Sequence, residues 1–243
     1  MAIVYTDTIE PRKPTQDITL GTTGETITLP GNDLRVNTVK DKGGNTLWTS
    51  DGSGNISSVN SGLKGNLVLL TTNTSTNQAS SSFTTLIDAT YDVYIFKFIN
   101  ISAVTTDLGV NFFFQTSTDG GSSYGVTATT TYWGADHNEN GSGGTLQYIA
   151  SGDLAQGTGY QRLTQALGNI ADEATSGELH LFNPSSTTYV KPFYTRTQGY
   201  GFGNTADDMY AAGYFNTTTA LNAIDFKMGS GTFDGTIKMY GLL

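Results

Sequence analysis

Residues 93–101, VYIFKFINI, decide the fold class of this chain. Tyr94, Phe96 and Phe98 recur at every second position, with Lys97 between them. Side chains at alternate positions of an extended backbone lie on one side of it, and aromatic and β-branched residues are enriched in strands. The stretch therefore predicts a β-strand with one buried side.

The same pattern continues on both sides of this strand. Seven further segments are rich in Tyr, Phe, Val, Ile and Thr and are bounded by Gly, Asn, Asp, Ser or Pro. They are 67–71, 110–117, 178–182, 188–197, 208–216, 221–228 and 235–242. About eight strands between 63 and 243 predict an all-β fold, an antiparallel, jelly-roll-like β-sandwich.

One segment has a helical pattern instead. In 160–174, YQRLTQALGNIADEA, apolar residues fall at i, i+3, i+4 and i+7, beginning at Leu163. Gly168 weakens the pattern because glycine is a poor helix former. We expect one or two helical turns over one end of the sandwich.

Residues 1–62 differ from the rest. Short ITL runs at 18–20 and 27–29 precede three short strand-like segments, and Gly-rich turns separate them. Their few large apolar side chains cannot bury a core alone, so the segment needs another surface to pack on. We expect an extended attachment arm or stalk of short strands that orders on assembly; a floppy leader is the alternative. Its expected contact residues are Leu34, Val36, Leu47 and Trp48.

The composition excludes several classes of protein. The chain of 243 residues has 12 Lys and Arg against 21 Asp and Glu, a formal charge of −9, so it lacks the basic footprint of a nucleic-acid binder. No apolar run approaches the ~18 residues of a membrane span. It has no cysteine, which excludes disulfides and thiolate sites. The first residues lack a secretory-signal pattern, so we expect no standard export.

Several stretches resemble virion structural proteins of tailed, especially marine, bacteriophages. Four lie in the predicted sandwich: YIFKFINI (94–101), VNFFFQTSTDGGSSYG (110–125), LFNPSSTTYVKPF (181–193) and AAGYFNTTTALNAIDFKMGSG (211–231), followed by GTIKMYGLL at the end. The stretch DKGGNTLWTSDGSGNISS (41–58) is similar to Gly-punctuated leaders of phage fibre and decoration proteins. The resemblance implies a component of the virion surface, associated as a homo-oligomer such as a trimer. It implies no active-site residue.

The candidate metal site is DHNENG at 136–141. Asp136, Asn138 and Asn140 alternate as the first ligands of a calcium loop do, and a glycine follows. The twelfth position is Gln147 rather than a bidentate Glu, and no helices flank the motif. A solvated loop therefore remains the alternative to Ca²⁺ binding, and we expect no other cofactor.

Catalysis has little support. A Ser-His-acid arrangement needs His137 or His180, and no Gly-x-Ser-x-Gly elbow is present. Glu178 lies two residues from His180 on the same side of a predicted strand and could orient its imidazole, but a histidine that is hydrogen-bonded across strands is the simpler interpretation. The remaining acids that could pair in a cleft fall in predicted loops, where they serve solubility: Asp172, Glu173, Asp207 and Asp208. We expect no enzyme.

Sugar binding is better supported. Tyr132 and Trp133 precede the polar 136–141 stretch, and Tyr200 and Phe202 lie in the Gly-rich QGYGFGN. Aromatic residues on loops at one end of a sandwich suit a glycan site, and they equally suit a trimer interface or positions that fill the core.

Three functions remain. The first is a capsid decoration or cement protein that binds the major capsid protein through its arm and displays the sandwich outward. The second is a tail-fibre or spike subunit that recognises host surface glycans, and the third is a virion-borne hydrolase. An arm of about 60 residues, at ~3.3 Å each, reaches far across a shell, which favours decoration.

Overall fold

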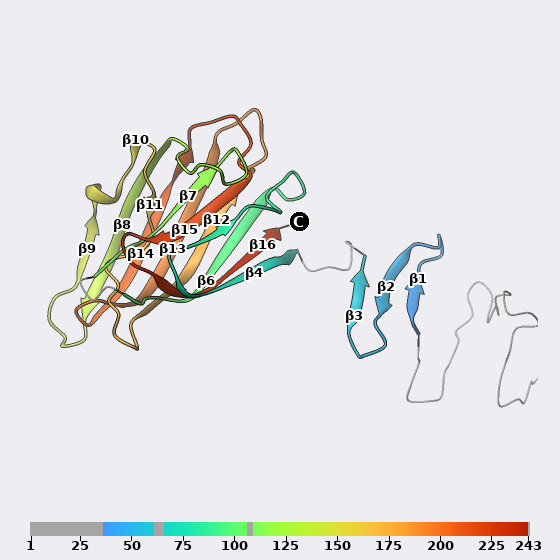
Figure 1. Cartoon of the computed structure of the whole chain (residues 1–243), viewed down its shortest axis with the longest axis horizontal. Coiled ribbons are helices and arrows are strands. Elements are labelled where there is room, and N and C mark those ends of the chain that lie inside the picture. Colours follow the sequence, from blue (N-terminus) through green and yellow to red (C-terminus); the bar gives the residue numbers. More distant parts are fainter. Residues whose placement is uncertain (1–35, 61–65, 106–108, 243) are drawn as a thin grey trace, which may run out of the picture. The chain divides into compact units, whose positions relative to one another are not determined.

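The structure is a computed structural model that describes residues 36–60, 66–105 and 109–242. The chain divides into two units, Met1–Leu63 and Lys64–Leu243, and each is described by itself. The described residues form strands and no α-helix (Figure 1). One short 3-10 helix, η2 (Ala150–Gly152), lies between β9 and β10. The strands are β1 (Thr38–Lys40), β2 (Thr46–Ser50), β3 (Ile56–Val59), β4 (Leu67–Gln78), β5 (Ser80–Phe83), β6 (Val93–Ala103), β7 (Phe112–Ser117), β8 (Ala128–Asn138), β9 (Thr145–Tyr148), β10 (Ala155–Gly157), β11 (Gln161–Arg162), β12 (Ala174–Phe182), β13 (Lys191–Gly201), β14 (Thr205–Phe215), β15 (Ala223–Met228) and β16 (Phe233–Leu242).

The described part of the first unit is a three-stranded antiparallel sheet in the order β1-β2-β3. Trp48 at its centre pairs with Val39 on one side and Val59 on the other. None of the side chains described between 36 and 60 is buried; Val36, Leu47 and Trp48 are half-buried. Leu34 and both ITL runs lie outside the described residues.

The two hairpins of this sheet are closed by the same device. In the first, the Asn45 amide N–H donates to Asp41 Oδ1 (2.8 Å) and Asn45 Nδ2 donates to Asp41 Oδ2 (2.9 Å). In the second, Asn55 makes the same two bonds to Asp51, at 3.1 and 2.9 Å. These hydrogen bonds lower the pKa of both aspartates. Local turn chemistry, rather than burial, shapes this sheet.

The second unit is an antiparallel sandwich. Its larger sheet has nine strands in the order β10-β8-β14-β13-β12-β6-β16-β4, with β9 also paired to β8. Its smaller sheet has four strands in the order β11-β7-β15-β5, and it lies over the larger one in Figure 1. The predicted all-β antiparallel sandwich is confirmed; the jelly-roll detail stays a prediction.

β6 has the predicted alternation. Tyr94, Phe96 and Phe98 are fully or almost fully buried, whereas on the other side Lys97 is half-buried and Ile99 is exposed, although Ile95 on that side is also buried. β6 lies inside the larger sheet, between β12 and β16. One of its two sides therefore faces the smaller sheet and the other faces away.

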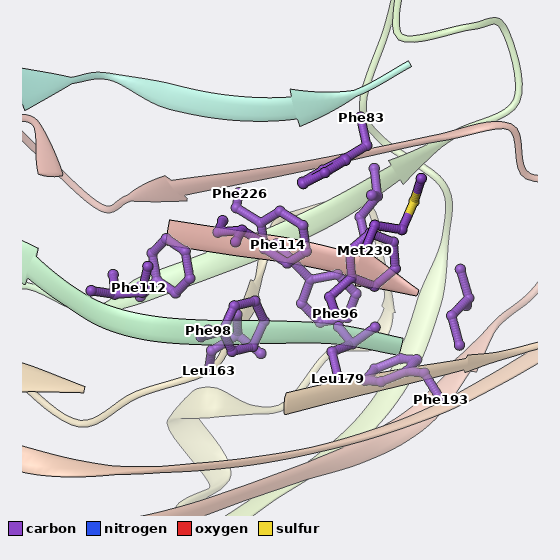
Figure 2. Packing of buried hydrophobic residues seen from close by; sticks show 14 of the residues in the cluster. Phe83, Phe96, Phe98, Phe112, Phe114, Leu163, Leu179, Phe193, Phe226 and Met239 are labelled. Carbon is purple, nitrogen blue, oxygen red and sulfur yellow. The ribbon is translucent and has the colours of Figure 1, made fainter. Parts of the chain in front are cut away.

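The core between the sheets is dominated by phenylalanine (Figure 2). Phe226 on β15 has ring contacts at centroid distances of 5.3 to 6.3 Å with five others: Phe83, Phe96, Phe98, Phe112 and Phe114. Fully burying one such side chain stabilises a fold by roughly 1.5–3 kcal/mol. Rings contributed by β5, β6, β7 and β15 therefore hold the two sheets together.

The helix expected at 160–174 is absent. The amide N–H groups of Leu163 and Leu167 donate to the carbonyls of Phe112 (2.8 Å) and Val110 (2.7 Å), so this segment runs beside β7 as extended and bent chain. Both leucines are buried. The apolar spacing reflects two inward leucines of a strand-like edge, and a distant partner segment satisfies its backbone.

β8 is a strand where a loop was expected. Residues 128–138 pair with β14 over their whole length. Threonine and glycine interrupt the apolar positions, which hides the two-residue period in this sequence. Tyr132 and Trp133 are therefore strand residues whose side chains point to opposite sides of the sheet.

Candidate functional site

The side of the nine-stranded sheet that faces away from the smaller sheet, here called the outer face, gathers most of the chemistry of the sandwich. Its residues are the alternate ones of each strand, such as Lys97 next to the inward Phe96. Strand registers align one outer residue from each of seven strands in a central row. From β9 to β16 the row is Tyr148, Trp133, Tyr210, Arg196, Glu178, Lys97 and Lys238.

One half of the central row is aromatic. The Trp133 and Tyr210 rings stack with centroids 4.1 Å apart and planes within 4°. Arg196 lies over the other face of the Tyr210 ring, 5.3 Å from its centroid. Because neighbouring strands carry these groups, the other face of the Trp133 indole points toward β9, where Tyr148 occupies the opposed register position. Trp133 is 38% exposed.

Arg196 is fixed by a fork of hydrogen bonds. Its Nε and one terminal nitrogen each donate to a different oxygen of Asp208, both at 2.9 Å. The Tyr210 hydroxyl donates to the same carboxylate (3.1 Å). Arg196 lowers the pKa of Asp208, because a bidentate partner favours the charged carboxylate.

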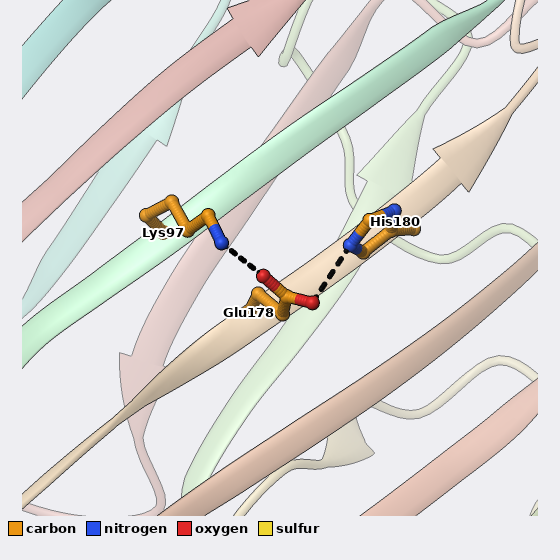
Figure 3. A network of polar contacts seen from close by, with 3 residues as sticks. All are labelled: Lys97, Glu178 and His180. Atoms are coloured by element: carbon orange, nitrogen blue, oxygen red, sulfur yellow. Dashed lines mark hydrogen bonds and ion pairs between the residues drawn. The ribbon is translucent and has the colours of Figure 1, made fainter. Parts of the chain in front are cut away.

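The other half of the row is an ion network (Figure 3). Lys97 binds one oxygen of Glu178, and His180 Nε2 lies 3.0 Å from the other. Burial alone would raise the pKa of Glu178, but the hydrogen bonds from Lys97 and His180 outweigh it and lower that pKa. The His180 ring also stacks on Tyr194, with centroids 4.5 Å apart.

This network holds the His180 ring in place, but it does not join that ring to a side chain that could act as a nucleophile. Glu178 and His180 form a hydrogen-bonded pair within β12, whereas the simpler expectation was a hydrogen bond from His180 across strands. Among the described residues, no hydrogen bond joins His180 to a serine or threonine hydroxyl. The arrangement fixes charges and rings in defined positions on the outer face.

The structure separates the four aromatic residues expected at a glycan or subunit contact. Tyr132 is fully buried and points inward, so it cannot contact a ligand at the surface. Trp133 and Tyr200 both lie on the outer face, but in different rows, and the Tyr200 hydroxyl donates to Asn204 (2.9 Å). Phe202 is exposed in the turn between β13 and β14.

The predicted calcium ligands are used within the chain. Asp136 and Asn138 lie in β8, so only Asn140 is in the turn that follows. Asp136 Oδ1 accepts the amide (3.1 Å) and the hydroxyl (2.7 Å) of Thr145. Asn140 Oδ1 likewise accepts hydrogen bonds from the amide N–H and the hydroxyl of Ser142. No cluster of three or more metal-binding side chains occurs among the described residues, and Ca²⁺ binding stays a prediction.

Two acids assigned to solvent by the sequence are buried. Asp207 lies in β14 and faces inward, 9% exposed, opposite Asp136. Burial raises its pKa to about 6, and the charge of Asp136 adds to the shift. Glu173 is 1% exposed, and neither of its oxygens has a hydrogen-bond partner among the described residues. Asp207 lies two positions before the inward-facing Met209, so the alternation of side chains along a strand could have predicted that it faces inward.

Comparison with known proteins identifies no relative. No family model, curated protein or solved structure matches the chain. The described residues contain no helix long and apolar enough to cross a membrane. The class that the fold defines is an antiparallel β-sandwich with a separate small sheet in front of it in sequence.

Proposed function

We propose that the chain is a non-enzymatic structural protein of a tailed-phage particle, a capsid decoration or cement protein. The N-terminal unit supports this most directly, because no side chain described between 36 and 60 is buried, whereas the sandwich has a core of its own. A sheet without a core gains stability by packing on another surface. The proposed surface is that of the phage head, formed by the major capsid protein.

The proposed mechanism is linkage between binding and assembly. Each copy attaches through its N-terminal unit and bridges neighbouring capsid subunits, with the sandwich displayed outward on the virion. Binding energy is then added only to the assembled shell, which shifts the equilibrium away from dissociated subunits.

The chain's two tryptophans provide the test, since Trp48 lies in the N-terminal unit and Trp133 on the outer face. We expect Trp48→Ala to abolish co-sedimentation of the full-length chain with phage particles, and Trp133→Ala to leave it intact. Deletion of residues 1–40 should also abolish it while the sandwich stays folded by circular dichroism. Undiminished co-sedimentation of the deleted chain would overturn the attachment role.

A tail-fibre or spike subunit that binds host surface glycans is the second candidate function. The partly exposed Trp133 indole favours it, because a pyranose can stack on an exposed aromatic ring beside hydrogen-bonding side chains. In this case a glycan array should retain the full-length chain, and Trp133→Ala should release it while Trp48→Ala does not. Gold-labelled antibody on the tail rather than the head would agree.

A further inference from the structure

The exposed large apolar side chains of the chain concentrate on the outer face. Of the twelve among the described residues, seven lie there, two each on the edge strands β4 and β9 and one each on β6, β8 and β13. They include Leu69, Ile99, Tyr148 and Tyr194, which are 40 to 61% exposed. Single exposed apolar residues are ordinary, but a contiguous set on one sheet face marks an interaction surface.

The outer face is also neutral in an acidic unit. Residues 64–243 hold seven Lys and Arg against fourteen Asp and Glu, a formal charge of −7. On the strands of the outer face, Lys97, Arg196 and Lys238 balance Glu178, Asp208 and Asp234. Two copies that meet through another, acidic surface of the sandwich would bring negative charges together. Two copies that meet through the neutral outer face would not.

Lys238 gives a second electrostatic signal. It lies directly opposite Lys97 in the β16–β6 pairing, and like charges at opposed positions destabilise a sheet. Lys97 has Glu178 as its partner, but Lys238 has no hydrogen-bond or ion-pair partner among the described residues. A carboxylate from a second outer face would supply the missing partner.

The extent of the face fits a protein rather than a small ligand. Seven strand spacings of ~4.8 Å separate β4 from β9, about 34 Å in all. The apolar residues extend over about 20 Å along β6, which gives an area on the order of 700 Å². A standard interface buries roughly 800 Å² on each partner, so the area of this face is close to that of a stable protein–protein interface.

We propose that the outer face of the nine-stranded sheet is the interface between copies of this chain. Tyr194 and Trp133 lie in the interior of the face and act as its anchors, since aromatic residues at the centre of an interface carry most of the binding energy. Arg196–Asp208 and Lys97–Glu178 set the orientation, and Lys238 pairs with an acid of the second copy. This interface is independent of the attachment role of the N-terminal unit.

The test measures the mass of the full-length chain by analytical ultracentrifugation. We expect an oligomer at concentrations up to about 100 μM, where a micromolar Kd is saturated. Tyr194→Glu should raise the dissociation constant at least about tenfold by placing a charge at the centre of the face. Tyr189→Glu, at an exposed loop tyrosine outside the face, should leave it unchanged.

Lys238→Glu is the second variant, because it reverses a surface charge without removing apolar contacts. It should also weaken association, and circular dichroism should show that each variant keeps the β-sheet signal of the parent. A parent chain that is monomeric at about 100 μM would overturn the proposal. So would an oligomer unchanged by both Tyr194→Glu and Lys238→Glu. A monomer whose Trp133 fluorescence responds to glycans would assign the face to sugar instead.

Discussion

The sheet of β1–β3 and the sandwich are both antiparallel and rich in turns, yet different interactions hold them. In the first, two Asp–Asn pairs close the hairpins and no described side chain is buried. In the second, the Phe226 ring alone contacts five other rings from three strands. Local hydrogen bonds are thus enough to shape a sheet, but long-range burial is needed to make it stable by itself.

The largest effect should come from the centre of the core. We expect Phe226→Ala to lower the free energy of unfolding of the sandwich by about 3–5 kcal/mol, through lost burial and the cavity left behind. Urea unfolding followed by Trp133 fluorescence in a Trp48→Phe background measures this. Phe113→Ala, on the neighbouring strand but only half-buried, should cost far less.

The same variant tests the division into two regions. In a Trp133→Phe background, the remaining Trp48 reports the N-terminal sheet. Its unfolding transition should not move when Phe226 is replaced. A shared displacement of both transitions would show that the two regions unfold as one unit, and the contrast between them would fail.

The next effect comes from a polar group inside the sandwich. Because the pKa of Asp207 is raised to about 6 from 3.8, the folded chain binds its proton more tightly than the unfolded chain. Stability therefore falls as pH rises from about 4 to about 6. Asp207→Asn should remove this loss, which is at most about 3 kcal/mol for a shift of about 2 units.

Urea unfolding from pH 3.5 to 8 measures the gain of Asp207→Asn, which should be full above about pH 6 and vanish below about pH 4. Asp208→Asn is the matched control at the next position. The pKa of Asp208 is lowered by Arg196, so its substitution should reduce stability at neutral pH and not at acid pH. Equal behaviour of the two variants would contradict the inward and outward assignments.

A smaller effect is expected in the turns of the N-terminal sheet. Asn45→Ala removes two hydrogen bonds to Asp41, and each such bond contributes about 1 kcal/mol or less at an exposed site. Amide hydrogen exchange in β1 and β2 should accelerate severalfold, while exchange in the sandwich stays the same. Lys42→Ala in the same turn should change neither. Unchanged exchange in Asn45→Ala would show that burial after all holds this sheet.

The smallest effect is expected at the ion network of the outer face. Glu178 is partly exposed, so Glu178→Gln should cost less than about 1 kcal/mol at neutral pH. Because the pKa of Glu178 is lowered in the folded chain, the contribution should fade as pH falls through its titration. Thermal melts at low salt and at about 1 M salt, where charges are screened within ~3 Å, should show the difference shrinking. If salt does not change the stability difference between the parent and Glu178→Gln, the contribution of Glu178 comes from packing rather than from its charge.

The features that could be predicted from the sequence are those that depend on residues close together in the chain. The alternation of Tyr94, Phe96 and Phe98 predicted β6, and the spacing of Glu178 and His180 indicated that the acid could orient the imidazole. Features that depend on distant pairing were missed. The strand β8 and the stacking partner of Trp133 follow from the β8–β14 register, which joins residues about 75 positions apart. The false helix at 160–174 arose in the same way, because its backbone partners lie on the β7 side of the smaller sheet.

The site was predicted only in part for a related reason. Trp133 is recognisable in the sequence because it lies shortly before the polar stretch 136–141. The outer face as a surface is not, because its central row takes one residue from each of seven strands that only the sheet brings together. The inward position of Asp207 could have been read from its alternation with Met209, but two adjacent acids resemble a solvated loop.

The position of β4 has a mechanical consequence. The chain passes from the N-terminal unit into β4, and among the described strands of its sheet β4 pairs with β16 alone, over nine register pairs. A load applied through the N-terminal unit therefore reaches the rest of the nine-stranded sheet through the ladder between β4 and β16. A pull along β4 shears all nine pairs together and is resisted strongly. A pull across it opens them one after another from Leu67, so the direction of force decides how firmly the sandwich is held.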